Sequence, residues 1–168
     1  MLLGLALLYV GAVLFLNGLW QCDKIASREI IVINLVVAGL SFLVAVHSAI
    51  LADSIDGVRA AAMTLLFAIT YLWVAYNQIY DCDERGLGWF SFFVAITVLP
   101  MAVVGLGTAN GLMDVWLGLC WAGWAVLWFL NFLRHVGRWP IKRVTGIITS
   151  FLGITTGWMP GLALLWGY

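Results

Sequence analysis

Six apolar stretches follow one another along the chain, each close to the ~20 residues that a helix needs to cross a bilayer. They cover residues 2–20, 30–52, 58–80, 88–107, 114–133 and 141–166. The segments between them are short, so neighbouring helices must be antiparallel and adjacent. Only 10% of the 168 residues are charged and 64% are hydrophobic, whereas a soluble domain carries about 25% charged residues. The sequence therefore predicts an all-α integral membrane protein, a compact bundle of six transmembrane helices with short loops that forms a single domain over residues 1–168.

The basic residues of the loops indicate how this bundle is oriented in the membrane. The first, third and fifth loops carry seven of them, whereas the other side of the bundle, with both termini, carries only Arg59. The seven are Lys24, Arg28, Arg85, Arg134, Arg138, Lys142 and Arg143. Because basic loops stay in the cytoplasm, the odd-numbered loops are predicted to be cytoplasmic and both termini to lie outside.

Charge is missing from the middle of every predicted span. The eight basic and eight acidic residues all fall in loops or at span ends. Proton pumps, proton-coupled transporters and charge-lined ion channels need ionisable groups at membrane depth, where each costs about 2.5–3.5 kcal/mol or more. No HExxH motif, aspartate pair or nucleophile elbow occurs, so neither an enzyme nor a metal or other cofactor is expected. The net charge of zero leaves no basic field for nucleic acid.

Two further patterns lie inside the predicted spans. Glycines recur at positions 4, 11 and 18 in the first span and at 153, 157 and 161 in the last, and small residues at such spacings let helix backbones pack closely. His47 is the only histidine within a predicted span, near the outer end of the second. A lone histidine in that place favours a hydrogen-bonded packing role over a ligand.

Aromatic side chains form stripes along the spans. Trp121, Trp124 and Trp128 share one helical face of the fifth span, and Trp124 lies near mid-depth, away from the interfacial belt that membrane tryptophans usually form. Spacing also groups Phe67 with Tyr71 in the third span and Leu7 with Leu14 in the first. Together these residues predict either a narrow slit, whose indole N–H groups and tyrosine hydroxyl hydrogen-bond to a thin planar solute, or a packed aromatic core or subunit interface.

Five segments resemble, in the same order, the AmiS/UreI family of urea and short-chain amide channels. They are LLYVGAVLFLNG at 7–18, FAITYLWVAYN at 67–77, GWFSFFVAI at 88–96, WAGWAVLW at 121–128 and GWMPG at 157–161. The resemblance implies a passive channel for urea or small aliphatic amides in the bacterial inner membrane. It further implies a homohexamer with one pore in each protomer, and a functional link to a cytoplasmic urease or amidase.

The resemblance also implies which residues line the pore, at two constrictions that strip water from the solute. Leu127 is added by the resemblance alone, and the other members were already grouped by spacing. The expected pore-lining residues are Leu7, Leu14, Phe67, Tyr71, Trp121, Trp124, Leu127 and Trp128. A non-transporting membrane scaffold or sensor subunit, and an ammonia or water pore, remain as alternatives.

Three departures from the family pattern bear on gating. Leu152 stands where the family usually has an acidic residue, the second loop (53–57) is short, and the outward loops and termini contain no histidine. Because histidine is the side chain whose charge changes between about pH 5 and 8, the sequence predicts a pore that external acid does not gate.

Overall fold

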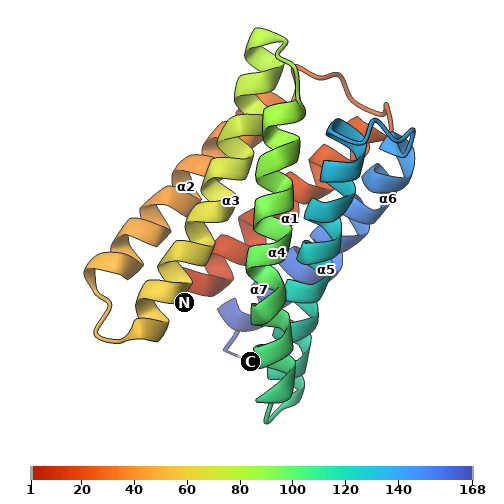
Figure 1. Ribbon diagram of the computed structural model, residues 1–168. Helices are drawn as coiled ribbons and strands as arrows, with labels where there is room; N and C mark the ends of the chain where they lie inside the picture. The colour runs from red at the N-terminus through yellow and green to blue at the C-terminus, as the bar shows by residue number, and fades with distance from the viewer. Residues whose placement is uncertain (1, 168) are drawn as a thin grey trace.

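The computed structural model describes residues 2–167 as a bundle of helices without strands (Figure 1). Five spans are single helices: α1 (Leu2–Gln21), α2 (Ile30–Ile50), α3 (Ile55–Tyr80), α4 (Arg85–Gly107) and α5 (Leu112–His135). The sixth span comprises α6 (Lys142–Leu152), the π-helical turn η1 (Gly153–Trp158) and α7 (Met159–Leu165). All six are long and apolar enough to cross a membrane. The predicted fold class is confirmed.

The helix ends differ from the predicted ones by a few residues, for local reasons. α3 begins at Ile55 rather than at 58, because the side chain of Ser54 accepts a hydrogen bond from the Gly57 N–H at 3.3 Å and caps the helix. α5 continues to His135 rather than ending at 133. The prediction that His47 is the only histidine within a span is therefore wrong, since His135 belongs to the last turn of α5.

The loops sort to opposite ends of the bundle (Figure 1). The loops after α1, α3 and α5 gather at one end, called here the vestibule end, which carries the seven basic loop residues. Both chain ends and the two other loops lie at the opposite end, called here the terminal end. This is the alternation that six antiparallel spans require. Which end faces the cytoplasm stays a prediction from the basic residues.

α1 packs against the whole sixth span, and their backbones touch. A Cβ atom added to Gly157 would lie 2.4 Å from the Cα of Gly11, and one added to Gly11 would lie 2.3 Å from the backbone nitrogen of Trp158. Only glycine fits such an approach, so the glycine spacing of both spans reflects helix packing.

The π-helical turn interrupts the sixth span near a proline. The Met159 N–H donates to the carbonyl of Ile154, five residues back, and Pro160 has no N–H to donate. The carbonyl of Thr155 is thus left without a donor from its own helix. This carbonyl accepts a hydrogen bond from the indole N–H of Trp116 on α5 instead.

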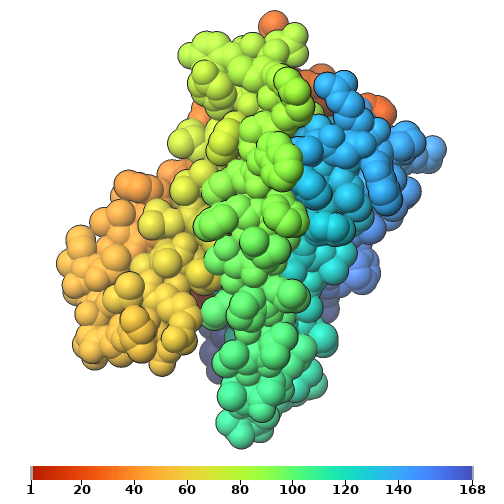
Figure 2. Space-filling model, viewed as in Figure 1, coloured from red at the N-terminus to blue at the C-terminus, as the bar shows by residue number. Residues whose placement is uncertain are grey.

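The outer surface is rich in apolar side chains, as a bilayer requires. Leu43 of α2 and Val103 of α4 are about two-thirds exposed, and each is one of many exposed aliphatic side chains. In Figure 2, α4 runs in front between α3 and α5, and the α2–α3 pair separates from the α4–α5 pair toward the terminal end. The interior between these two pairs holds the aromatic stripes.

Candidate functional site

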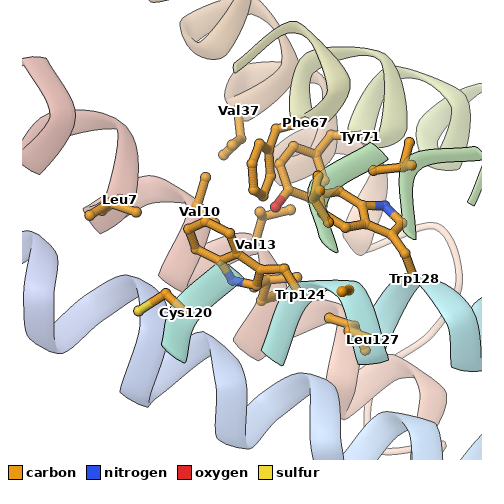
Figure 3. Packing of buried hydrophobic residues seen from close by; sticks show 14 of the residues in the cluster. Leu7, Val10, Val13, Val37, Phe67, Tyr71, Cys120, Trp124, Leu127 and Trp128 are labelled. Carbon is orange, nitrogen blue, oxygen red and sulfur yellow. The ribbon is translucent and has the colours of Figure 1, made fainter. Parts of the chain in front are cut away.

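The eight residues expected to line a pore lie together in the interior of the bundle (Figure 3). They come from α1, α3 and α5, and none is turned fully outward. Trp121 is partly buried against the cluster, and the others are buried: Leu7, Leu14, Phe67, Tyr71, Trp124, Leu127 and Trp128. The stripes predicted on separate helices therefore face one another across a common centre.

Phe67 is the ring around which the aromatic cluster is arranged. Its centroid lies 4.9 Å from that of Trp124, with an angle of 82° between the planes, and 4.9 Å from that of Trp128. Tyr71 follows at 6.2 Å, and Trp121 stands edge-on to Trp124 at 5.0 Å. These are the distances of aromatic rings in direct contact. The rings are interlocked at this level, so no slit is open between Phe67 and Trp124 in this structure.

Cavities nevertheless lie on both sides of this contact. The central cavity, of about 60 Å³, is lined by Leu14, Tyr71, Leu127 and Trp128 toward the vestibule end. The terminal cavity, of about 110 Å³, is lined by Leu7 and Trp121 toward the terminal end. Each has room for several water molecules. Phe67 and Trp124 line both cavities, so their two rings form the wall between them.

The central cavity continues into a wide vestibule of about 670 Å³ at the vestibule end. The two spaces share part of their lining, namely Trp20, Gln78, Glu84, Arg134 and His135. A row of three spaces therefore runs along the bundle, interrupted by the Phe67–Trp124 wall.

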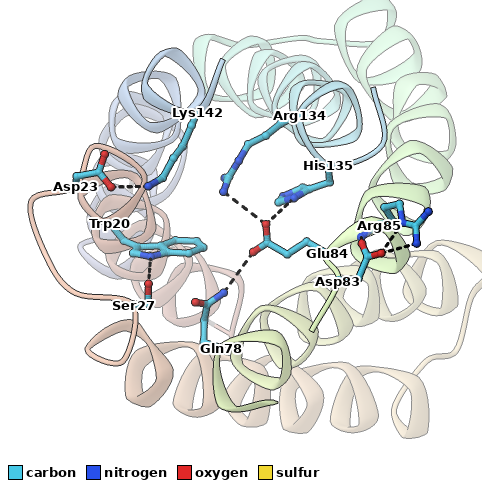
Figure 4. A network of polar contacts seen from close by, with 10 residues as sticks. All are labelled: Trp20, Asp23, Ser27, Gln78, Asp83, Glu84, Arg85, Arg134, His135 and Lys142. Carbon is cyan, nitrogen blue, oxygen red and sulfur yellow. Dashed lines mark hydrogen bonds and ion pairs between the residues drawn. The ribbon is translucent and has the colours of Figure 1, made fainter. Parts of the chain in front are cut away.

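A charged cluster stands where the vestibule meets the central cavity (Figure 4). The Glu84 carboxylate lies 2.9 Å from Nδ1 of His135 and 3.7 Å from the Arg134 guanidinium, and it accepts a hydrogen bond from Gln78 at 3.4 Å. Burial raises the pKa of Glu84, but the hydrogen bond and charge of His135 and the charge of Arg134 together outweigh this effect and lower it. Sequence reasoning missed this cluster because its members come from different span ends.

Two of the three indole N–H groups of the cluster are already occupied. Nε1 of Trp124 donates to Oγ1 of Thr156 at 2.8 Å, and Nε1 of Trp128 donates to Oγ1 of Thr70 at 3.3 Å. The expectation that the indoles are free to hydrogen-bond to a solute is therefore wrong for Trp124 and Trp128 in this structure, and it stays a prediction for Trp121. Tyr71 is buried, and its hydroxyl makes none of the side-chain hydrogen bonds found within residues 2–167. In Figure 3 this hydroxyl points inward among the rings. The Tyr71 hydroxyl and the Trp121 N–H are therefore polar groups of the cluster that a solute can use.

Neutral amide side chains line the central cavity beyond the rings. Asn17 and Asn34 exchange hydrogen bonds at 3.0 and 2.7 Å, a pairing of two carboxamides inside the bundle. Gln21, one turn after Asn17, is 5% exposed, and its side-chain oxygen has no hydrogen-bond partner among the described residues. Asn131 lies on the same cavity. The sequence shows these amides, but only the fold shows that they converge.

Two positions singled out in the sequence lie away from the rings' contact. His47 is exposed on α2 near the terminal end, so the expected packing role within the chain is wrong. Leu152 is partly buried on α6 and packs over α5, with a methyl carbon 3.0 Å from where a Cβ of Gly123 would lie. The aliphatic side chain of Leu152 thus packs against α5 at Gly123.

Comparison with known proteins agrees with this architecture. The model of the AmiS/UreI family transporters matches residues 2–168. An acid-activated urea channel of Helicobacter pylori is 31% identical over 192 residues, covering 97% of each chain. A protein of Mycolicibacterium smegmatis, described as a transporter of amidate substrates, is 38% identical over 167 residues, covering 98% of this chain and 76% of that protein.

The fold agrees equally well with a solved structure. The Helicobacter pylori urea channel in its closed state superposes with a TM-score of 0.86 at 32% identity, covering 97% of both chains. The family and these relatives are channels and transporters rather than enzymes. The chain is therefore a multi-pass bacterial membrane protein that belongs to the AmiS/UreI family of transporters.

Proposed function

We propose that this protein is a passive channel for urea or small aliphatic amides, which pass along the row of three spaces and cross the Phe67–Trp124 wall. The observation that carries the proposal is that two cavities meet at this wall from opposite sides. The relatives named above, a urea channel and a transporter of amidate substrates, support this class of solute. The eight residues of the aromatic and leucine cluster are proposed to line the path.

The chemistry of the wall suits an uncharged planar molecule. The Tyr71 hydroxyl offers a hydrogen bond to a carbonyl oxygen or an amide N–H, while the faces of Phe67 and Trp124 cover the flat solute. An ion would have to give up its water with no charged partner at the wall, which is far more costly than for a neutral amide. The path therefore favours neutral solutes and needs no coupling to ions.

Amides on the vestibule side extend this selectivity. Gln21 and Asn131 line the central cavity, and a carboxamide pairs with urea or an amide through the same donors and acceptors that join Asn17 to Asn34. A solute that has shed its water at the rings therefore meets replacement hydrogen bonds directly beyond them.

The proposal extends to the assembly and its surroundings. The whole chain, 1–168, would form one channel unit with both termini outside, and the units would assemble into a homohexamer with one path in each protomer. The many exposed apolar side chains can contact lipid on one side of the protomer and neighbouring protomers on another. A cytoplasmic urease or amidase would consume the solute and thereby maintain its gradient.

Light scattering of vesicles that contain the purified protein tests this function. After rapid mixing with urea or acetamide, these vesicles should swell faster than protein-free vesicles, and potassium should not permeate. Swelling equal to that of protein-free vesicles would favour a non-transporting scaffold or sensor subunit. Fast water or ammonia passage without passage of urea or acetamide would favour the third candidate.

A further inference from the structure

The hydroxyl of Thr156 is placed to hold the Trp124 indole. Thr156 is 6% exposed, and its Oγ1 donates to the carbonyl of Leu152 at 2.6 Å while accepting from Nε1 of Trp124 at 2.8 Å. Because the proton of the hydroxyl is engaged within its own helix, the lone pairs remain for the indole N–H. The same indole is in contact with the ring of Phe67, with 4.9 Å between centroids.

The segment that carries the Thr156 hydroxyl packs closely against α1 and α5. Thr156 belongs to the π-helical turn η1, in which Gly153 and Gly157 touch the backbone of α1. The neighbouring Thr155 carbonyl, which Pro160 leaves without a helical donor, accepts from Nε1 of Trp116 at 2.9 Å. The π-helical turn thus accepts hydrogen bonds from two indoles of α5, those of Trp116 and Trp124. π-Helical turns often occur at functional sites, and this one faces the aromatic wall.

We propose that Thr156 is a positioning residue, which keeps Trp124 against Phe67 and so sets how wide a solute can pass. This inference rests on the proposed channel function. When a solute crosses, Trp124 must move away from Phe67, and the hydrogen bond to Thr156 resists that movement. The net value of one hydrogen bond corresponds to roughly a 2- to 13-fold change in the populations of the two indole positions.

Substitution of Thr156 separates this role from ordinary packing. Thr156→Val keeps the shape but removes the acceptor, whereas Thr156→Ser keeps the acceptor. Thr155→Val is the matched control, since the Thr155 hydroxyl donates only to the carbonyl of Phe151, and the backbone carbonyl that holds Trp116 is unchanged. Thr156→Ala also lacks the hydroxyl and needs less room, so it replaces Thr156→Val if that variant does not fold.

The first readout is the ratio of urea to butyramide permeability in vesicles. We expect this ratio to fall roughly 2- to 13-fold in Thr156→Val, because the bulkier amide gains more from a loosened indole, and to stay at the wild-type value in Thr156→Ser and Thr155→Val. A wild-type ratio in a folded Thr156→Val protein would overturn the inference. Absence of urea flux in the wild type would instead refute the proposed function.

The second readout does not depend on transport. In protein labelled with ¹⁵N-tryptophan, the indole N–H resonance of Trp124 is assigned by its loss in Trp124→Phe. The resonance should move upfield and exchange faster with solvent in Thr156→Val, and should keep its position in Thr156→Ser and Thr155→Val. An unshifted, protected resonance in Thr156→Val would show that Thr156 does not hold the indole.

Discussion

The ring of Phe67 on α3 stands edge-on to the indole of Trp124 on α5, with 4.9 Å between centroids and 82° between planes, and both rings border cavities on either side. The two rings are part of the packed aromatic core, and they also separate the central cavity from the terminal cavity. In the proposed function, a solute crosses when these two rings separate.

Tyr71→Phe should lower urea permeability. The Tyr71 hydroxyl lies in the aromatic cluster and is available to the solute, so its removal costs the solute one hydrogen bond, about 0.5–1.5 kcal/mol net. Stopped-flow swelling should therefore show a decrease of roughly 2- to 13-fold. Tyr76→Phe is the control, because Tyr76 is exposed on the same helix. Equal permeability in both variants would mean that the hydroxyl does not contact the solute.

Gly157→Ala should destabilise the fold. The added methyl group would meet the Cα of Gly11 at 2.4 Å, and the two backbones would have to separate. Overpacking of this kind costs about 1–3 kcal/mol or more, measured as a lower thermal unfolding temperature in detergent. Gly39→Ala is the control, since a Cβ there would meet nothing within 4 Å. A variant Gly157→Ala as stable as Gly39→Ala would contradict the close α1–η1 contact.

Glu84→Gln should remove a pH-dependent part of the stability. The pKa of Glu84 is lower in the folded protein than its usual value, so its ionisation stabilises the fold above the unfolded-state pKa, and this contribution is lost as pH falls through the folded-state pKa. The wild type should unfold at a higher temperature than Glu84→Gln at pH 7, and the difference should shrink below about pH 4.

The control for Glu84 is Asp56→Asn, which breaks an exposed ion pair with Arg59. Exposed pairs contribute little, so this variant should follow the wild type at every pH. If the difference in unfolding temperature between the wild type and Glu84→Gln does not change with pH, the charge of the Glu84 carboxylate does not contribute to stability.

External acid should not gate the channel. His47 is exposed on α2 near the terminal end, away from the cavities, and Leu152 carries no ionisable group. Urea flux into vesicles should change less than about twofold as external pH falls from 7 to 5, the range in which histidine gains its charge. His47→Ala should behave in the same way. A several-fold rise in flux in the wild type that His47→Ala abolishes would assign gating to this histidine.

The sequence predicted the parts of the molecule that local pattern determines. Long apolar runs located all six spans. Glycine spacing predicted that the first and last spans pack closely against other helices, and the structure shows that they pack against each other at Gly11 and Gly157. Aromatic spacing grouped Phe67 with Tyr71 and Trp124 with Trp128, because residues three or four apart share a helix face. Leu127 came from the family resemblance rather than from spacing.

What the sequence did not predict depends on contacts between distant segments. The occupation of the Trp124 and Trp128 indoles by threonines arises only when α5 meets the sixth span and α3. The π-helical turn had one local signal, the GWMPG segment with Pro160, but a proline alone does not reveal that a turn changes its hydrogen-bond pattern. The contact of the Glu84 carboxylate with Nδ1 of His135 joins residues far apart in the chain.

The central claim is that solutes cross between Phe67 and Trp124, and urea and butyramide permeabilities of Trp124→Ala test it most directly. Phe129→Ala is the control, because Phe129 is exposed on the same helix. If the account is right, Trp124→Ala remains assembled, passes both solutes faster and discriminates less between them, while Phe129→Ala matches the wild type. Unchanged permeability and unchanged discrimination in a folded Trp124→Ala protein would contradict the account.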